Sequence, residues 1–496
     1  MPDDRKLFYS MAGTLHDLAE IQGLLEWDQQ VMMPRRGAEQ RANQMASLAG
    51  LMHQKATSPE AGDAILKMEN RDDLTADERA DVREARRAYD RAVKLPGELV
   101  QARAKAVAMA QSVWEEARPH NDFPTFKPHL EEVVKLTRET ADALGGENRY
   151  DSLLEEFEPG MTEEHLQGLF KEIKTRLVPL IEAVRGAPGQ PDASILRRSF
   201  PKGGQEAFCR SVVADMGYNM EAGRLDVSAH PFTIGTLADV RITTRYLEDF
   251  LPTALFGVIH EAGHALYEQG LAHERYRNPS GGSCSLGIHE SQSRFWENMV
   301  GRSRSFWRHY YGPLKKQFPD ALGDVNEDAF YRAVNTVKPS LIRVEADEAT
   351  YNLHILVRFE LESALLRGSL EAADLPEAWN TKMQSYLGVT PPDDRDGVLQ
   401  DIHWSAGLIG YFPTYTLGNL FAAQFMETLR KDMPDLDDRV GRGELLPIRD
   451  WLRENIHQHG RRYLPGDLCI KVTGKPLSAS ASMDYLELKY RALYGL

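Results

Sequence analysis

The sequence contains little cysteine and no long apolar run. Among its 496 residues only three are cysteines, Cys209, Cys284 and Cys469. They are too few and too scattered for a disulfide framework or a cysteine-type zinc site, and we expect each to be a small buried side chain. The amino terminus lacks the apolar core of a signal peptide, and no segment reaches the roughly 18 apolar residues of a membrane span.

Basic residues are also in the minority. The chain has 59 Lys and Arg against 74 Asp and Glu, which gives a formal net charge of −15. A protein that binds nucleic-acid phosphates needs a clustered excess of positive charge, so this balance disfavours that class. With 42% hydrophobic and 27% charged residues, the composition is that of a soluble globular protein. We therefore expect a reduced, cytoplasmic protein with no membrane or nucleic-acid partner.

Local patterns predict a mainly α chain. Segment 74–117 has apolar residues at helical spacing, and Pro96 and Pro119 are its natural breaks. Segment 161–184 has the pattern of an amphipathic helix, which Thr162 opens with two glutamates in the first turn. The Gly- and Pro-rich segment 186–204 predicts a loop.

Segment 224–247 has a different pattern, with Val, Ile and Thr at near-alternate positions between Pro and Gly, which predicts short strands. Helical spacing returns after Leu251 and is interrupted by the glycine-rich segment 278–287. No linker clearly separates independent domains. We therefore expect one large unit, made of a mainly helical half (1–222), a small sheet (223–250) and a second helical half (251–496).

The second helical half contains a metal-binding pattern, His260-Glu261-Ala262-Gly263-His264. Residues i and i+4 share one face of a helix, so the two imidazoles can hold one ion in adjacent coordination positions. Glu261 can then act as a general base on a metal-bound water. The flanking residues are largely apolar, and buried histidines and a carboxylate are unfavourable without a partner. A pair of satisfied core histidines is the alternative.

A catalytic metal site needs a third protein ligand and an open fourth position. Glu290 lies after the glycine-rich loop, on a segment that we expect to be helical, and is our candidate. His273 is a rival, but it lies in a polar stretch that we expect to be solvated. We expect His289 to line the site without binding the metal, because adjacent side chains on a helix point about 100° apart.

Further motifs occur in a fixed order along the chain: WDQQVMMP at 27–34, HPF at 230–232, DVRIT at 239–243, HEAGH at 260–264, HESQ at 289–292, IRVEAD at 342–347, GVLQDIHW at 397–404, YFPTYTLGN at 411–419 and TGKPL at 473–477. In this ordered set the chain resembles the carboxypeptidase Taq family of zinc-dependent metallocarboxypeptidases. Between about residues 35 and 222 the resemblance rests on helical character alone.

The resemblance implies a mostly helical, saddle-shaped single unit with a deep active-site groove and a small antiparallel β-sheet, related to neurolysin and angiotensin-converting enzyme. It also implies a homodimer and a Zn²⁺ cofactor that Co²⁺ can replace. The implied substrates are peptides with a free C-terminal carboxylate, from which family members release single residues with broad specificity.

The resemblance assigns the substrate's terminal carboxylate to Arg343, within IRVEAD. A guanidinium matches a carboxylate with two parallel hydrogen bonds, which a lysine cannot make. Without the family match, a helix ion pair with Asp347 at i+4 would be the simpler interpretation. Gln400 is a further candidate for binding the substrate backbone, with a purely structural amide as the equal alternative.

His403 and Tyr411 would stabilise the oxyanion that forms when water attacks the scissile carbonyl, since both can donate hydrogen bonds. Tyr415 is the rival of Tyr411 for this role. The motifs HPF and DVRIT, with His230 and Arg241, would shape the closed end of the groove, where a strand edge can pair with a peptide. An ion pair between Arg241 and Asp239 is the structural alternative.

The sequence therefore predicts a metallocarboxypeptidase in which His260, His264 and Glu290 hold zinc and Glu261 is the general base. The nearest alternative is a zinc oligopeptidase that cuts internal bonds, with a purely structural Arg343. A non-catalytic, zinc-stabilised peptide-binding scaffold belongs to a different class, and it would have no need of the base Glu261.

Overall fold

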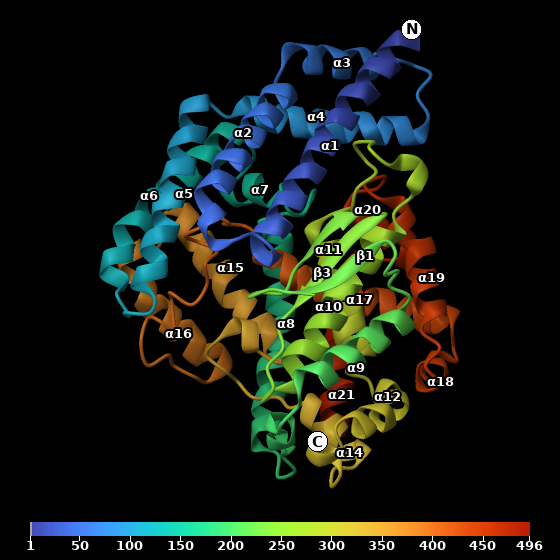
Figure 1. Ribbon diagram of the computed structural model, residues 1–496. Helices are drawn as coiled ribbons and strands as arrows, with labels where there is room; N and C mark the ends of the chain where they lie inside the picture. Colours follow the sequence, from blue (N-terminus) through green and yellow to red (C-terminus); the bar gives the residue numbers. More distant parts are fainter. Residues whose placement is uncertain (1) are drawn as a thin grey trace. The chain divides into compact units, whose positions relative to one another are not determined.

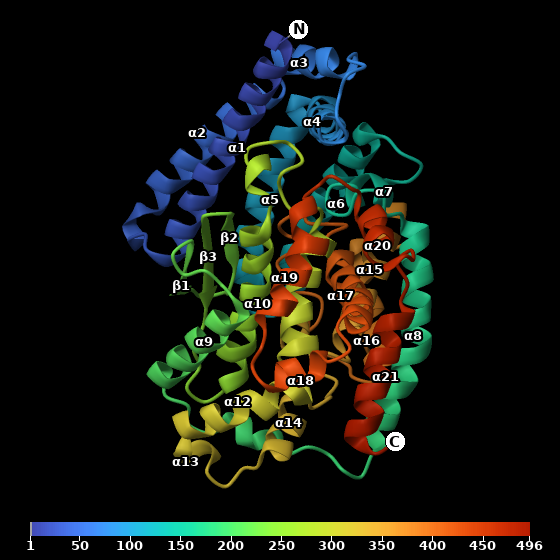
Figure 2. The same cartoon turned by 90° about the vertical axis from the view of Figure 1, so that its right-hand side faces the viewer.

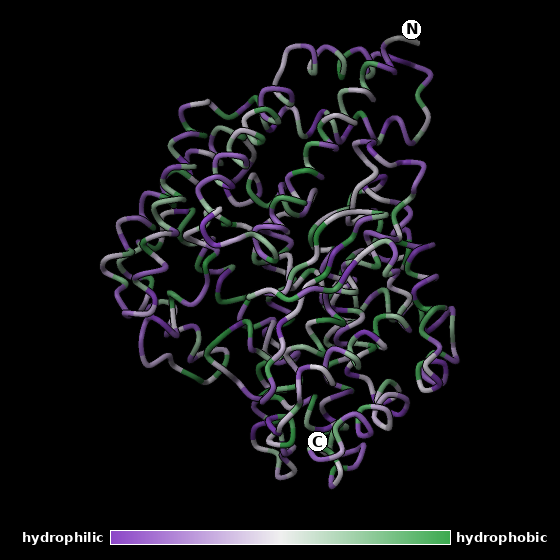
Figure 3. Tube along the Cα trace, viewed as in Figure 1, coloured by the Kyte–Doolittle hydropathy of each residue, from purple (hydrophilic) through white to green (hydrophobic). Residues whose placement is uncertain are grey.

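Helices form most of the computed structural model, which describes residues 2–496, with side chains from Asp4 onward. The predicted break at Pro96 separates helices α4 (Ala76–Lys94) and α5 (Gly97–Ala117). Helix α8 (Glu163–Gly186) begins after Thr162, whose hydroxyl accepts a hydrogen bond from the His165 N–H at 3.2 Å. The mainly helical class is confirmed, and Figure 3 shows polar and apolar residues mixed along most helices.

The chain folds into two compact units, and each draws on three separate stretches of sequence. The first consists of Met1–Val93, Pro191–Val334 and Phe421–Pro476, and the second of Lys94–Gln190, Asn335–Leu420 and Leu477–Leu496. The sequence-based division at residues 222 and 250 followed local pattern only. A single catalytic domain made of both units stays a prediction.

The first unit holds the sheet and most of the helices formed by the N-terminal and C-terminal parts of the chain (Figure 1). Its helices are α1 (Pro2–Val31), α2 (Ala38–Ala56), α3 (Pro59–Glu69), α4, α9 (Lys202–Met216), α10 (Leu251–Gly270), α11 (Leu286–Arg294), α12 (Arg304–Gln317), α13 (Pro319–Leu322), α14 (Glu327–Val334), α18 (Leu436–Gly441), α19 (Leu446–Asn455) and α20 (Pro465–Thr473). Short 3₁₀ turns accompany them at η1 (Arg35–Gly37), η2 (Ala193–Arg197), η3 (His273–Arg275) and η7 (His457–His459), and α11 continues into a π-helical segment, η4 (Phe295–Val300).

The second unit is built around α15 (Tyr351–Arg367), whose side chains are nearly all buried. Its other elements are α5, α6 (Phe123–Leu144), α7 (Arg149–Leu154), α8, η5 (Arg343–Glu345), η6 (Ala372–Asp374), α16 (Leu375–Leu387) and α21 (Ser480–Tyr494). The residues of α17 (Pro413–Asp432) are divided between the two units. Helices α8 and α21 lie side by side (Figure 2), and Arg176 binds Asp484 at 2.6 Å and Glu487 at 2.9 Å across them.

The small sheet has three strands, β1 (Gly223–Val227), β2 (Thr233–Thr236) and β3 (Asp239–Thr244), in the order β1-β3-β2. β2 pairs with β3 in antiparallel fashion, but β1 pairs with β3 in parallel, so the expectation of an antiparallel sheet is wrong for one pairing. The reason is the connection 228–232, which reverses the chain at the end of β3. There the Thr243 hydroxyl accepts a hydrogen bond from the Phe232 N–H at 3.0 Å.

Helix α10 packs against the sheet, as both ribbon views show. Its other side meets α11, and the two backbones approach closely at Gly263. A Cβ atom at Gly263 would lie 2.6 Å from both the Gln292 carbonyl oxygen and the Ser293 Cα. Only a residue without a side chain allows this spacing, which brings α11 directly over the face of α10.

Among the described residues, no helix has both the length and the apolar character that crossing a membrane requires.

The variant Gly263→Ala is expected to lower the free energy of unfolding by about 1–3 kcal/mol, because the methyl group would overlap backbone atoms of a packed helix. Gly257→Ala is the matched control on the same helix, since its Cβ would have Thr244 Oγ1 at 3.7 Å as its nearest neighbour. Denaturant unfolding of both variants measures the difference. Equal stabilities would contradict the close approach of α10 and α11.

Candidate metal centre

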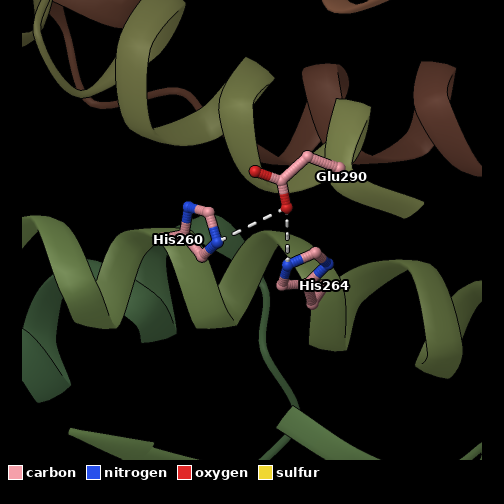
Figure 4. A group of neighbouring side chains, drawn as sticks. All are labelled: His260, His264 and Glu290. Atoms are coloured by element: carbon pink, nitrogen blue, oxygen red, sulfur yellow. Dashed lines mark ion pairs between the residues drawn. The ribbon is translucent and has the colours of Figure 1, made fainter. Parts of the chain in front are cut away.

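Helices α10 and α11 bring three candidate metal ligands together in the first unit (Figure 4). The Glu290 Oε2 atom lies 3.7 Å from His260 Nε2 and 3.4 Å from His264 Nε2. His260 and His264 share one face of α10 because they are one helical turn apart. The ligand atoms of these three side chains all lie within 4.8 Å of one another, so among the described residues they form a group that can hold one metal ion.

The pKa shifts of His264 and Glu290 suit a divalent cation. Burial and the neighbouring His289 lower the pKa of His264 to about 3, so its imidazole is neutral and able to bind a metal. Burial opposes ionisation of Glu290, but Arg294 and the two histidines outweigh it and hold the pKa of this carboxyl well below its usual value. Two imidazole nitrogens and one carboxylate oxygen fit an ion such as Zn²⁺, with one coordination position left open.

Each histidine is held from behind by a second hydrogen bond. His260 Nδ1 lies 2.9 Å from a Glu297 oxygen, and His264 Nδ1 lies 2.5 Å from His289 Nδ1. His289 Nε2 in turn lies 2.9 Å from a Glu268 oxygen. With Nε2 of His260 and His264 turned to the metal, the Nδ1 atoms of these two histidines are the donors to Glu297 and His289. Such bonds fix the tautomer and the orientation of metal-binding imidazoles.

Two arginines balance the carboxylates behind the site. Arg294 Nε donates to the second oxygen of Glu290 at 2.6 Å, while Arg302 donates to Glu297 at 3.2 Å. Burial opposes ionisation of Glu297, but His260 and the two arginines lower the pKa of its carboxyl to about 2. The carboxylates therefore stay ionised in a buried setting, as a cation site requires.

Glu261 lies beside the ligands and is oriented by the sheet. Its Oε2 atom accepts a hydrogen bond from the Thr233 hydroxyl of β2 at 2.6 Å. Burial raises the pKa of the Glu261 carboxyl above its usual value, which brings it closer to the range in which a general base works well near neutral pH.

Sequence reasoning missed Glu297 and Glu268. Glu268 continues the i, i+4 spacing of His260 and His264 along α10, so its position on the same helical face was available from the sequence. Glu297 lies in the π-helical segment η4, whose wider turns a 3.6-residue period does not describe. His273 is exposed, as expected, and His289 contacts His264 beside the ligands, while its not binding the metal stays a prediction.

The second unit holds the predicted oxyanion donors in one aromatic cluster. His403 Nε2 lies 3.3 Å from the Tyr415 hydroxyl. The ring centroid of Tyr411 lies 5.5 Å from that of His403 and 5.5 Å from that of Tyr415. Burial lowers the pKa of His403 to about 4, so the imidazole is neutral at neutral pH and carries one N–H donor. Both tyrosines are half-buried, and the geometry leaves the choice between them open.

Arg343 is also buried in the second unit, but its partner is not the one considered from the sequence. Its Nε and one terminal nitrogen donate to Asp401 Oδ1 at 3.0 and 2.9 Å. The alternative of a helix ion pair with Asp347 is wrong, because only the short turn η5 forms there. Asp347 instead accepts hydrogen bonds from backbone N–H groups of Lys338 and Thr350.

The remaining predicted residues have contacts of their own. Arg241 makes two hydrogen bonds of 2.8 Å to Asp239, which confirms the structural ion pair, and its guanidinium lies 4.3 Å from the Trp27 ring centroid. His230 is exposed in the connection between β1 and β2. Gln400 accepts from the Arg343 N–H at 2.9 Å and donates to the Leu341 carbonyl at 3.0 Å, as expected for a structural amide.

Comparison with known proteins agrees with the motifs. The model of the carboxypeptidase Taq (M32) metallopeptidase family matches residues 8–490. The chain is 50% identical over 493 residues to thermostable carboxypeptidase 1 of Thermus thermophilus, covering 96% of each protein. It is 39% identical over 494 residues to carboxypeptidase 1 of Bacillus subtilis, covering 99% of each. The solved M32 carboxypeptidase from Deinococcus radiodurans R1 shows a TM-score of 0.98 at 42% identity, with 100% of both chains covered.

The fold and these relatives define the class of the protein as a metallocarboxypeptidase. Within that class, the chain belongs to the carboxypeptidase Taq (M32) metallopeptidase family. The resemblance seen in the motifs is therefore confirmed, and membership of a metallopeptidase family implies a divalent metal, which the donor set of the first unit fits.

The variant Glu297→Gln is expected to weaken metal binding by roughly 10- to 100-fold, because His260 would lose the carboxylate that fixes its tautomer and orientation. A competition titration against a chelator measures the affinity. Glu274→Gln, at an exposed position in η3, is the control and should bind metal like the unchanged protein. Unchanged affinity in Glu297→Gln would show that this carboxylate does not support the ligand.

Proposed function

We propose that this metallocarboxypeptidase uses zinc to release single residues from the free carboxyl termini of peptides, with broad specificity. The observation that carries the proposal is the convergence of His260, His264 and Glu290 beside Glu261, in a chain whose relatives are named carboxypeptidases. His260, His264 and Glu290 would hold the ion. When bound, zinc supplies a Lewis acid that activates water and polarises a carbonyl group, and Co²⁺ accepts the same donors.

Glu261 has the role of general base. Its carboxylate takes a proton from the attacking water and later delivers a proton to the leaving amine, so that one group serves both halves of the reaction. The hydrogen bond from Thr233 at 2.6 Å fixes one carboxylate oxygen and leaves the other for this proton transfer. A purely structural metal site has no use for such a base, which argues against the non-catalytic scaffold.

His403 and Tyr411 have the role of donating hydrogen bonds to the oxyanion, with Tyr415 as the alternative to Tyr411. The neutral state of His403 supports this role, because a neutral imidazole still carries one N–H for donation. Arg343 has the role of binding the terminal carboxylate, so that only the last peptide bond is positioned for attack.

The sheet has the role of holding the substrate backbone. β2 is an edge strand, and its Thr233 touches Glu261, so an extended peptide that pairs with this edge would run beside the base. The ion pair of Arg241 with Asp239 favours a supporting role for Arg241 in this sheet, and we assign Gln400 to the support of Arg343. A homodimer and a cytoplasmic location remain predictions from the sequence.

The variant Glu261→Gln is expected to lose activity by at least about 100-fold while it keeps its metal, since the amide cannot accept the proton. Steady-state peptidase assays and elemental analysis of the same preparation measure both properties. Glu274→Gln is again the matched control. A Glu261→Gln variant with full activity would rule out this mechanism.

A peptide and its carboxyl-amidated twin separate the carboxypeptidase from an oligopeptidase. We expect the free peptide to be shortened by one residue and the amide to react at least about 100-fold more slowly, because Arg343 loses an ionic partner. Mass spectrometry of the products measures both rates. Equal cleavage of the twins would favour the oligopeptidase, in which Arg343 is structural.

A further inference from the structure

In the second unit, Asp401 lies between two buried guanidinium groups. Its Oδ1 atom accepts from Arg343 Nε and a terminal nitrogen at 3.0 and 2.9 Å, and its Oδ2 atom accepts from Arg358 Nε at 2.6 Å. The Arg358 side chain is 0% exposed and that of Arg343 is 6% exposed. Gln400 links the two arginines, since its Oε1 atom accepts from the backbone N–H of Arg343 at 2.9 Å and from a terminal guanidinium nitrogen of Arg358 at 2.8 Å.

The charges of this cluster do not cancel. Two guanidinium groups share one carboxylate, which leaves one positive charge in excess. The nearby imidazoles do not change the sum, because burial holds the pKa of both His354 and His403 below the usual value and keeps them neutral. Glu362, one turn after Arg358, accepts hydrogen bonds from Trp404, Gly410 and Tyr150 and forms no ion pair with either guanidinium. Burial raises the pKa of its carboxyl to about 7, so Glu362 carries only part of a negative charge at neutral pH and does not cancel the excess.

The excess charge is available at Arg343. Of the five N–H donors of a guanidinium, Arg343 directs two to Asp401 and one to the Tyr351 hydroxyl at 2.9 Å. One N–H on each terminal nitrogen therefore remains for a ligand. A buried cation that lacks a counter-charge is unfavourable, so the cluster favours an incoming anion.

Arg358 determines whether that charge is available. With Arg358 present, the two oxygens of Asp401 are divided between the two arginines. Without Arg358, the full charge of Asp401 would neutralise Arg343, and an incoming carboxylate would meet a neutral ion pair. Asp401 has a separate effect, because its Oδ1 atom fixes the rotation of the Arg343 guanidinium.

We propose that Arg358 and Asp401 are positioning residues for Arg343. Arg358 takes up the charge of Asp401, so that Arg343 keeps its own charge for the substrate's terminal carboxylate, while Asp401 holds Arg343 in the orientation that places the scissile bond. This inference rests on the proposed carboxypeptidase function.

Steady-state kinetics on a peptide with a free carboxyl terminus test the inference with Arg358→Met, Asp401→Asn and the double variant. Arg358→Met is expected to raise KM about tenfold or more, the effect of weakening a charge-assisted bond, with kcat changed less than about threefold. Asp401→Asn is expected to lower kcat, because the carboxylate is held in a poorer orientation. The double variant should recover a KM near that of the unchanged protein, since no carboxylate at position 401 is left to neutralise Arg343.

The KM of the double variant separates this role from a structural one. The double variant lacks more hydrogen bonds of the cluster than Arg358→Met does. If the cluster only supports the fold, the KM of the double variant will therefore be at least as high as that of Arg358→Met. Arg149→Met, which breaks an exposed ion pair with Asp142, is the control for losing one positive charge and should leave KM unchanged.

Folding is checked by thermal unfolding, and Arg358→Lys serves if Arg358→Met does not fold. The lysine keeps a charge beside Asp401 but not the several hydrogen bonds of the guanidinium, so its KM should rise less than about tenfold. A wild-type KM in Arg358→Met, or a KM in Arg358→Lys that rises about tenfold, would overturn the inference alone. An unchanged protein that releases no terminal residue would instead overturn the proposed function and with it this inference.

Discussion

The close contact between α10 and α11 is the constraint on which the metal centre depends. At Gly263 the backbone of one helix lies against that of the other, with no space for a side chain. This contact places Glu290 of α11 within 3.4 Å of His264 and 3.7 Å of His260 on α10. Gly263, inside the HEAGH motif, is therefore part of the ligand geometry, since it sets the distance between the helix that offers two nitrogens and the helix that offers the oxygen.

The buried charges around the ligands form a second level of organisation. His260 forms a hydrogen bond with Glu297, and His264 forms one with His289. His289 in turn forms a hydrogen bond with Glu268. Arg294 and Arg302 balance the carboxylates that this arrangement buries. The second unit repeats the principle with opposite sign, because there two arginines share Asp401. One cluster thus favours a cation, and the other favours an anion.

The sequence predicted those features that depend on short-range periodicity. His260, Glu261 and His264 follow from the turn of one helix, and Thr162 was identified as a helix cap from its local pattern. Contacts between distant residues were beyond such reasoning, since Glu297 meets His260 across 37 positions and Asp401 meets Arg343 across 58. The parallel pairing of β1 with β3 was missed for the same reason, because it depends on how the connection 228–232 turns back.

The central claim is that His260, His264 and Glu290 hold one divalent metal ion. An anomalous-difference map from a crystal of the zinc-loaded protein tests it most directly. We predict a single strong peak bonded to the Nε2 atoms of both histidines and to the Glu290 carboxylate, about 2.0–2.2 Å from each. A peak at other residues, or no peak in a crystal of protein that is active as a peptidase, would contradict the account.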